Sequence, residues 1–573
     1  MTVLASGSAL LRLDASWIDY LLVAIYFLFV LGIGLMARRS VSSSLDFFLS
    51  GRSLPAWVTG LAFISANLGA VEIMGMSANG AAIGMPTFHY YWIGAIPAML
   101  FLAVVMMPFY YGSKVRSVPE FMHRRFGPAA HLVNAISFAV AQVLIAGVNL
   151  YLLATIVNAL LGWPIWVSTI IAAVIVLFYI TLGGLSAAIY NEVLQFFVIV
   201  AALTPLTVIG LSKVGGWSGL QDKMTQAGSG SQMASWPGTA LTEFSSSVWS
   251  VIGIVLGLGF VLSFGYWTTN FVEVQRAMAS KDMNAARRAP VIGSFPKMFI
   301  PFIIIVPGMI SAVLVPELAK YKASGGKSGG GVTYDNALLY LMRDLLPNGL
   351  LGIAIAGLLA AFMAGMAANI SAFNTVMSYD IWQAYVQKDK PDAFYTRFGR
   401  WATVAATIIA IGTSFFAGQY SNMMDYLQVL FGFFNAPLFA TFILGMFWKK
   451  MSAAAGWTGL VSGTVAAVIV AVLSKDALGV AGQGGVSVGV INLSGQGAAF
   501  VAAGAAFIVD VIVSVLVTGM SRPKPESELR GLVYSLTPKE DLMGERVSHW
   551  WESPTRLAGI SLVLVIILNV IFH

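Results

Sequence analysis

The sequence contains no cysteine and very little charge. Only 10% of its 573 residues are Asp, Glu, Lys or Arg, whereas an ordinary soluble domain carries about 25%. The absence of cysteine excludes disulfides, thiolate metal ligands, iron–sulfur clusters and cysteine nucleophiles. The scarcity of charge excludes a water-exposed surface over most of the chain. Apolar residues make up 58% of the sequence, in long continuous runs. This pattern indicates an all-α integral membrane protein.

Apolar runs bounded by charge, proline or glycine predict about 14 membrane-spanning helices. The first run is followed by Arg38 and Arg39 without a small-residue cleavage pattern, so we expect it to be retained rather than removed as a signal peptide. The expected spans are 16–37, 55–81, 87–111, 128–160, 165–183, 187–212, 246–275, 291–316, 348–383, 398–418, 424–448, 454–474, 496–520 and 555–572.

The basic residues are distributed unevenly among the loops. Most of the 32 Lys and Arg residues fall in every second loop. Lys297 is the only one away from the ends of an expected span, since Arg400 and Arg556 stand among the first three residues of theirs. Cytoplasmic loops are enriched in Lys and Arg, which places these loops inside and both termini outside the cell membrane. The net charge of +7 therefore reflects membrane sidedness, and we expect no nucleic-acid partner.

The sequence offers no catalytic constellation. Its five histidines are scattered without the paired spacing of a zinc site, and no serine stands in a nucleophile elbow. The glycine-rich segment 324–331 lacks the spacing and preceding strand of a phosphate-binding loop. We therefore expect no enzyme and no organic cofactor.

Two predicted spans are interrupted by polar and small residues in mid-membrane. The interruptions are 65–72 in the second span and 263–270 in the seventh, which lie five helices apart. Matching interrupted helices indicate an inverted-repeat transporter with a site at the midplane, although small residues can also serve close helix packing. The expected domains are 1–54, a first repeat 55–212, an outer loop 213–245, a second repeat 246–448, and three peripheral helices in 449–573 with a charged inner loop at 521–556.

Several separated motifs occur in a fixed order along the chain. They are Gly51-Arg52-Ser53-Leu54-Pro55, Ser65-Ala66-Asn67-Leu68-Gly69, Val118-Pro119-Glu120-Phe121, Arg125-Phe126-Gly127, Gly183-Gly184-Leu185-Ser186-Ala187-Ala188-Ile189-Tyr190, Tyr266-Trp267, Gln275-Arg276 and Phe447-Trp448-Lys449-Lys450. With them the sequence resembles the solute:sodium symporter family, and within it the sodium/glucose cotransporter branch. The resemblance implies two inverted five-helix repeats, two broken helices, a central sugar site and alternating access.

The resemblance also implies a solute site. Tyr266 would be its aromatic inner gate, with Trp267 beside it. Glu72 and Tyr91 depart from the family pattern, in which Gln or His and Glu stand at these positions. The pocket still offers the donors and acceptors that a small neutral sugar or polyol needs. The implied solute contacts are Asn67, Glu72, Tyr91, Gly94, Ser263, Lys297 and Gln428.

Structural roles remain open for several of these residues. Glu72 and Lys297 could neutralise one another as a buried pair, and Gln428 could be an interhelical hydrogen-bond partner. Tyr90, Tyr91 and Trp92 could be packing aromatics, and His89 a local hydrogen-bonding residue.

Glu192 takes the place of a family Asp near the inner ion exit, which makes it a candidate proton site. It could equally cap the sixth helix near its N-terminus.

The family's sodium site is degraded in this sequence. The resemblance assigns backbone carbonyls of Ser65, Leu68 and Ala361 as ligands, but Ala364 and Gly365 occupy the two hydroxyl positions. Because three carbonyls hold a hard cation poorly, we expect weak or absent sodium dependence, with Glu72 as the candidate proton carrier.

Other interpretations of the coupling and of the function stay open. A one-turn shift of register could restore a hydroxyl such as that of Ser371, and a different sodium site could form on Glu72. An uncoupled transporter and a solute sensor that does not transport also remain. The sensor is less favoured, because the inner loop 521–556 has too little apolar sequence for a folded signalling domain.

Overall fold

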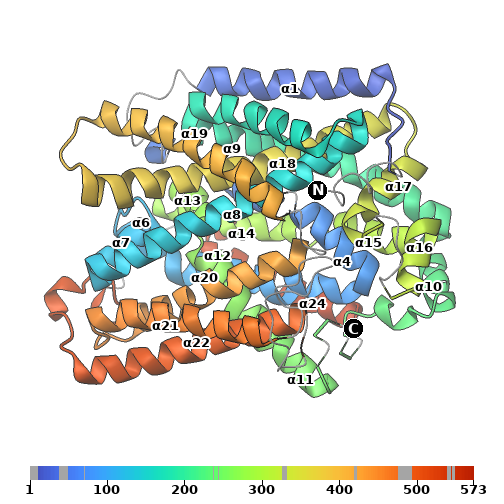
Figure 1. Cartoon of the computed structure of the whole chain (residues 1–573). Coiled ribbons are helices and arrows are strands. Elements are labelled where there is room, and N and C mark those ends of the chain that lie inside the picture. Colours follow the sequence, from blue (N-terminus) through green and yellow to red (C-terminus); the bar gives the residue numbers. More distant parts are fainter. Residues whose placement is uncertain are drawn as a thin grey trace.

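The computed structural model shows an all-helical bundle over the residues that it describes (Figure 1). These are 11–37, 50–69, 71–236, 238–239, 241–242, 244–325, 332–417, 423–474, 493, 495–538, 542, 544 and 549–573. The Arg38–Arg39 pair and most of the glycine-rich segment 324–331 lie outside them. The side chains of Gly183, Gly184, Ser186 and Ala187 are likewise outside the description.

α-Helical and π-helical segments of different lengths make up most of the bundle. In chain order they are α1 (Trp17–Ala37), α3 (Ala56–Asn67), η4 (Val71–Gly75), α4 (Met76–Ile83), η6 (Tyr90–Ala95), α5 (Ile96–Phe101), η7 (Leu102–Met106), α6 (Met107–Gly112), α7 (Val118–Phe126), α8 (Pro128–Leu161), α9 (Ile165–Val214), α10 (Gly216–Gln226), α11 (Ser247–Ile252), η9 (Gly253–Ser263), α12 (Phe264–Thr269), α13 (Phe271–Met278), α14 (Met283–Lys297), α15 (Ile300–Leu314), α16 (Pro316–Ala323), α17 (Ala337–Leu345), α18 (Leu350–Thr375), η11 (Val376–Val386), α19 (Asp392–Ala417), α20 (Met423–Phe447), α21 (Ala453–Leu473), α22 (Gly495–Met520) and α24 (Pro554–Ile571).

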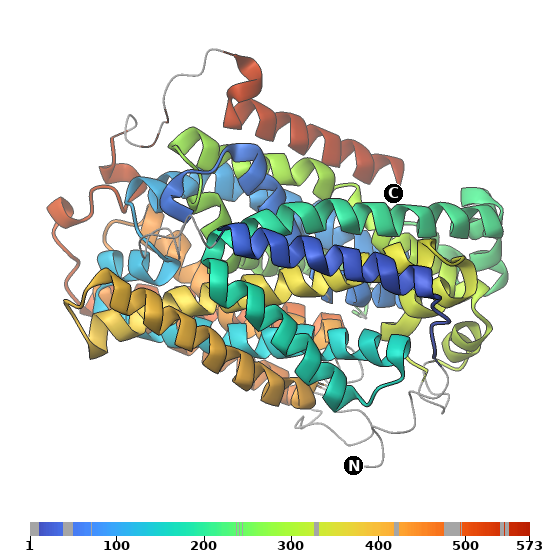
Figure 2. The same ribbon diagram turned by 90° about the horizontal axis from the view of Figure 1, so that it is seen from above.

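Among the described residues, ten helices are long and apolar enough to cross a membrane, or eleven with one bent pair. Trp17–Ile33 and Ile165–Phe178 are shorter apolar helices. The expected total of about 14 spans is therefore not confirmed. The expected fifth and sixth spans form the single helical run α9, which Figure 2 shows extending in two different directions.

Both predicted interruptions are present. The second span breaks between α3 and η4, where the two halves are bent by 59°, and Leu68 leaves helical geometry with ψ at 49°. The seventh span breaks at Asn270, whose backbone is extended and whose side chain accepts a hydrogen bond from the Val272 N–H. That hydrogen bond satisfies a free donor at the start of α13. The first interruption therefore bends a span in its middle, whereas the second coincides with the end of the Ser247–Thr269 span.

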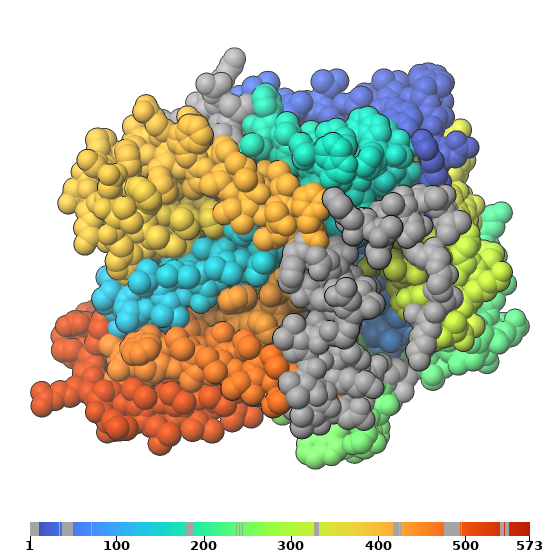
Figure 3. Space-filling view, viewed as in Figure 1, coloured from blue at the N-terminus to red at the C-terminus, as the bar shows by residue number. Residues whose placement is uncertain are grey.

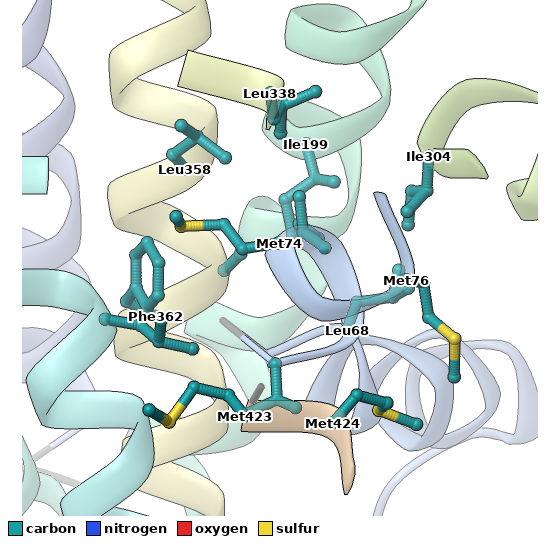
Figure 4. Close-up of a cluster of buried hydrophobic side chains, with 14 of the residues drawn as sticks. Leu68, Met74, Met76, Ile199, Ile304, Leu338, Leu358, Phe362, Met423 and Met424 are labelled. Carbon is teal, nitrogen blue, oxygen red and sulfur yellow. The ribbon is translucent and has the colours of Figure 1, made fainter. Parts of the chain in front are cut away.

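Apolar side chains pack around the first break and hold it inside the bundle. Figure 4 shows residues of α18, such as Leu358 and Phe362, beside Met74 and Met423. On the periphery the pattern is reversed, because α22 and α24 expose large apolar side chains such as Ile508 and Val570. These helices occupy an outer face of the bundle, as the space-filling view shows for α22 (Figure 3). An apolar outer face suits contact with lipid.

The two ends of the described chain lie at one end of the bundle. The start of α1 is tied there, since Asp19 accepts hydrogen bonds from the backbone N–H groups of Gly349 and Gly352. At the other terminus the Phe572 carbonyl accepts hydrogen bonds from Ser235. Figure 1 places α10, α16 and α17 at this same end.

Some basic residues assigned to inner loops are buried. The guanidinium of Arg125 donates to the carbonyls of Gly445, Trp448 and Met451, and Arg276 is completely buried. Their positive charges are therefore structural and are not solvated loop charges. The membrane orientation was predicted from the positions of Lys and Arg along the sequence, and this rule takes no account of whether a side chain is buried.

Candidate functional site

A polar cavity lies beside the first helix break. It has an empty volume of about 790 Å³, open solvent included. Most of the predicted solute contacts line it. The lining residues from that prediction are Asn67, Glu72, Tyr91, Ser263, Tyr266, Trp267, Lys297 and Gln428.

Glu72 and Lys297 form an ion pair in the wall of this cavity. Lys297 Nζ lies 2.6 Å from Glu72 Oε1, and the side chains are 1% and 12% exposed, respectively. Lys297 Nζ also donates to Asn67 Oδ1 and lies 4.7 Å from the centre of the Tyr91 ring. The two residues are therefore a pair, and Glu72 still reaches the cavity because part of its side chain stays accessible.

Tyr266 connects the cavity wall to a second buried carboxylate. Its hydroxyl accepts a hydrogen bond from Asn67 Nδ2 at 3.1 Å and donates to Glu273 Oε1 at 3.0 Å. Its ring packs edge-on against Trp267, with the ring centres 5.4 Å apart. These hydrogen bonds hold the Tyr266 hydroxyl in one place.

The third span contributes aromatic side chains with different roles. Tyr90 and Tyr91 line the cavity, and Tyr90 also donates a hydrogen bond to Gln496 of α22. Trp92 faces the packed interior and donates to the Met298 carbonyl at 3.0 Å. Gly94 lies directly against Ser263, whose hydroxyl leaves no room for a Cβ at that position. Gly94 therefore lets the third and seventh spans pack closely.

His89 lies outside the cavity. Its Nε2 is 2.6 Å from the Ser235 carbonyl, and its ring contacts Trp236 with centres 4.0 Å apart. The local hydrogen bond expected from the sequence is present.

The region of the expected sodium ligands is tightly packed. A Cβ on Gly365 would lie 2.9 Å from Gly69 Cα and 3.1 Å from Asn149 Oδ1. The Ala361 carbonyl oxygen and Asn149 Oδ1 both lie within 4 Å of the position that a Cβ on Gly69 would take. Ser65 is fully buried, and its hydroxyl has no hydrogen-bond partner among the described residues. Asn149 is a polar side chain of this region that the sequence patterns did not single out.

Glu192 forms an ion pair instead of capping a helix. Its carboxylate oxygens accept from Arg276 at 2.6 and 3.2 Å, and both side chains are completely buried. The capping interpretation was wrong because Arg276, 84 residues away in the sequence, folds against this position. The sequence did not reveal this partner.

Glu273, whose carboxylate accepts from Tyr266, is a buried acidic residue that no sequence pattern singled out. It is completely buried in α13. Its sequence context, with Arg276 three residues later, is typical of an amphipathic loop helix. Only the packing of α3, α14 and α18 against α13 removes it from water.

A bundle of apolar helices with a broken span and a polar cavity at the break is typical of a secondary transporter rather than an enzyme. The comparisons with known proteins are consistent with this class. The model of the sodium:solute symporter family matches residues 47–463. The chain therefore belongs to that family.

Sugar and polyol cotransporters are among the relatives that the chain resembles. The sodium/glucose cotransporter of Vibrio parahaemolyticus is 29% identical, over 80% of this chain and 85% of the relative. Sodium/glucose cotransporter 2 of Rattus norvegicus is 28% identical, over 78% of this chain and 70% of the relative. Sodium/myo-inositol cotransporter 2 of Oryctolagus cuniculus is 27% identical, over 78% of this chain and 68% of the relative.

A solved structure shows the same fold. It is a Na⁺-coupled sialic acid symporter in a substrate-bound outward-open state, with a TM-score of 0.69 and 18% identity over 89% of this chain and 99% of the other. The protein is thus a multi-pass membrane protein and a secondary transporter of the sodium:solute symporter family.

Proposed function

We propose that this protein moves a small neutral sugar or polyol across the cell membrane by alternating access. The observation that carries the proposal is the cavity beside the first break, which combines hydrogen-bonding groups with aromatic faces. Asn67, Gln428 and Ser263 provide neutral donors and acceptors. The pair of Glu72 with Lys297 provides charged ones without net charge. Such a set suits hydroxyl groups, and the faces of Tyr91 and Trp267 suit C–H surfaces.

The relatives support this choice of solute, since two of them are cotransporters of glucose and one of myo-inositol. The test is counterflow in proteoliposomes loaded with D-glucose or myo-inositol. Saturable uptake of the labelled solute against its unlabelled form supports transport. Binding without exchange would leave a sensor, and neither binding nor exchange with any sugar or polyol would contradict the proposed solute class.

We propose in addition that protons drive this transport and that sodium dependence is weak or absent. The family is named for sodium, but the two hydroxyl positions of its sodium site are Ala364 and Gly365 here. The close contact of Gly365 with Gly69 supports the proposal, because it leaves no space for a hydroxyl-bearing side chain. Sodium requires several oxygen ligands, and a proton requires one.

We keep the orientation and the domain limits as proposals. Both termini would face outward, with 55–212 and 246–448 as the inverted repeats. Tagging each terminus and testing its access to a membrane-impermeant reagent in intact cells would check the orientation. Labelling of either terminus only after permeabilisation would contradict it.

A further inference from the structure

Five ionisable side chains form a buried cluster that runs from the cavity into the bundle. They are Glu72, Lys297, Glu273, Arg276 and Glu192. Lys297 pairs with Glu72, and Arg276 pairs with Glu192. Within the described part of the chain Glu273 has no ion-pair partner. The cluster therefore carries three carboxyl groups and only two cations.

The surroundings of Glu273 do not supply the missing charge. Of the helices packed against α13, α3 and α18 have no ionisable residue. Helix α12 offers the neutral Tyr266. Of the basic residues of α14, Arg287 donates to the Ala103 carbonyl, Arg288 is partly exposed, and Lys297 is paired with Glu72. Arg276 of α13 itself is paired with a second carboxylate, that of Glu192. Because both nearby cations are already paired, an ionised Glu273 would give the cluster one net negative charge in the protein interior, which is costly.

The hydrogen bonds of Glu273 are incomplete. Its Oε1 accepts from Tyr266, but its Oε2 is buried and has no partner among the described atoms. A sodium ion would need several further oxygen ligands around this atom, and the cavity that reaches Tyr266 does not reach Glu273. A proton needs no such space. It converts the carboxylate into a neutral acid and removes the excess charge.

We propose that Glu273 is the proton-binding site of the transport cycle. Its ionised carboxylate accepts a hydrogen bond from the Tyr266 hydroxyl and so keeps this side chain in the cavity wall. This inference rests on the proposed proton-driven transport. A hydrogen bond from a hydroxyl to a carboxylate is stronger than one to a neutral acid. Binding of a proton to Glu273 Oε2 therefore weakens the hold on the Tyr266 hydroxyl and lets its ring move. Loss of the proton restores the hold.

The same hydrogen bonds connect the proton site to the solute site. Tyr266 accepts from Asn67, Asn67 accepts from Lys297, and Lys297 pairs with Glu72 in the cavity. A solute that binds Asn67 or Glu72 changes the hydrogen bonds at the far end of this chain of contacts. Solute binding and proton binding are thereby coupled through direct contacts.

The first test detects the proton itself. Purified protein is compared at acidic and alkaline pH by infrared difference spectroscopy, which resolves the carbonyl stretch of a protonated carboxylic acid. We expect a band that disappears in Glu273→Gln and persists in Glu526→Gln, a matched change at an exposed carboxylate. A band unaffected by Glu273→Gln, or no band in the unmodified protein, would overturn the inference.

The second test separates this inference from the proposed function. Proteoliposomes with Glu273→Gln should exchange D-glucose or myo-inositol at a rate that no longer depends on pH, because the neutral amide resembles the protonated acid. They should no longer accumulate it under an inward proton gradient. Proton-driven accumulation that survives the change would overturn the role of Glu273. Absence of such accumulation in the unmodified protein would instead refute proton-driven transport, and the infrared band would still decide whether Glu273 binds a proton. If Glu273→Gln fails to fold, Glu273→Asp, which keeps a carboxyl at a shorter reach, should retain an infrared band at a shifted position.

Discussion

Gly365 of α18 lies against Gly69 at the break of the second span, and a Cβ on Gly365 would stand 2.9 Å from Gly69 Cα. Real Cβ atoms essentially never come so close to another heavy atom. The approach of the two backbones therefore depends on glycine at position 365. The family resemblance implies that position 365 is one of the two hydroxyl positions of the sodium site.

A side chain at position 365 should destabilise the protein. We expect Gly365→Ser to lower the free energy of unfolding by about 1–3 kcal/mol, because the backbones must separate to admit it. The matched control is Gly412→Ser in α19, where a Cβ meets nothing within 4 Å. Thermal unfolding of the purified variants measures both effects. A Gly365→Ser variant as stable as the control, with sodium-stimulated uptake, would show that a sodium site is easily restored.

The two completely buried glutamates should respond in opposite ways to the same substitution. Glu192→Gln leaves the Arg276 guanidinium buried without its carboxylate, and we expect a loss of about 3–5 kcal/mol of stability. Glu273→Gln removes an unpaired charge, so the stability should be unchanged or higher. Melting temperatures of the two variants at neutral pH give the comparison. Equal losses would mean that Glu273 has a charge partner.

The sequence alone was sufficient to predict those site residues that lie within apolar spans. Lys297 and Glu72 stand out because a charge among apolar residues is unusual, and the two interruptions are visible as polar residues in mid-span. Glu273 and Arg276 could not be recognised in this way, because they stand at the very end of the expected span 246–275 and just beyond it. They follow the break at Asn270 in a short polar segment, where charge is ordinary, and their burial is produced by helices distant in sequence. The count of spans failed for a related reason, since apolar runs show where helices exist and not which of them reach across a membrane.

Gln428 should contribute directly to solute binding. It lines the cavity in α20 and is largely buried. Removing its amide costs one or two hydrogen bonds to the solute, so we expect Gln428→Ala to weaken D-glucose or myo-inositol binding roughly 10-fold. Lys297→Ala should also weaken binding. The control is Gln383→Ala, outside the cavity in η11. Unchanged affinity in both Gln428→Ala and Lys297→Ala would show that the site is misassigned.

Lys322 should make the stability depend on pH in the alkaline range. It lies in α16, outside the membrane-spanning helices, and donates to the Ala81 carbonyl near the end of α4 and to Gln232. Burial lowers the pKa of Lys322 from 10.5 to about 8. Between these values the unfolded chain binds more protons than the folded one, so stability rises with pH.

The variant Lys322→Met lacks this titration. Its melting temperature should therefore rise less than that of the unmodified protein between about pH 8 and about pH 10. A parallel pH dependence in the two proteins would contradict the low pKa of Lys322.

The coupling ion decides the central claim. The measurement is uptake of labelled D-glucose or myo-inositol into proteoliposomes under an inward sodium gradient, an inward proton gradient, or neither. We predict accumulation under the proton gradient, and under the sodium gradient alone no more uptake than with no gradient. Accumulation driven by sodium alone and insensitive to pH would contradict the account and make this protein an ordinary sodium symporter.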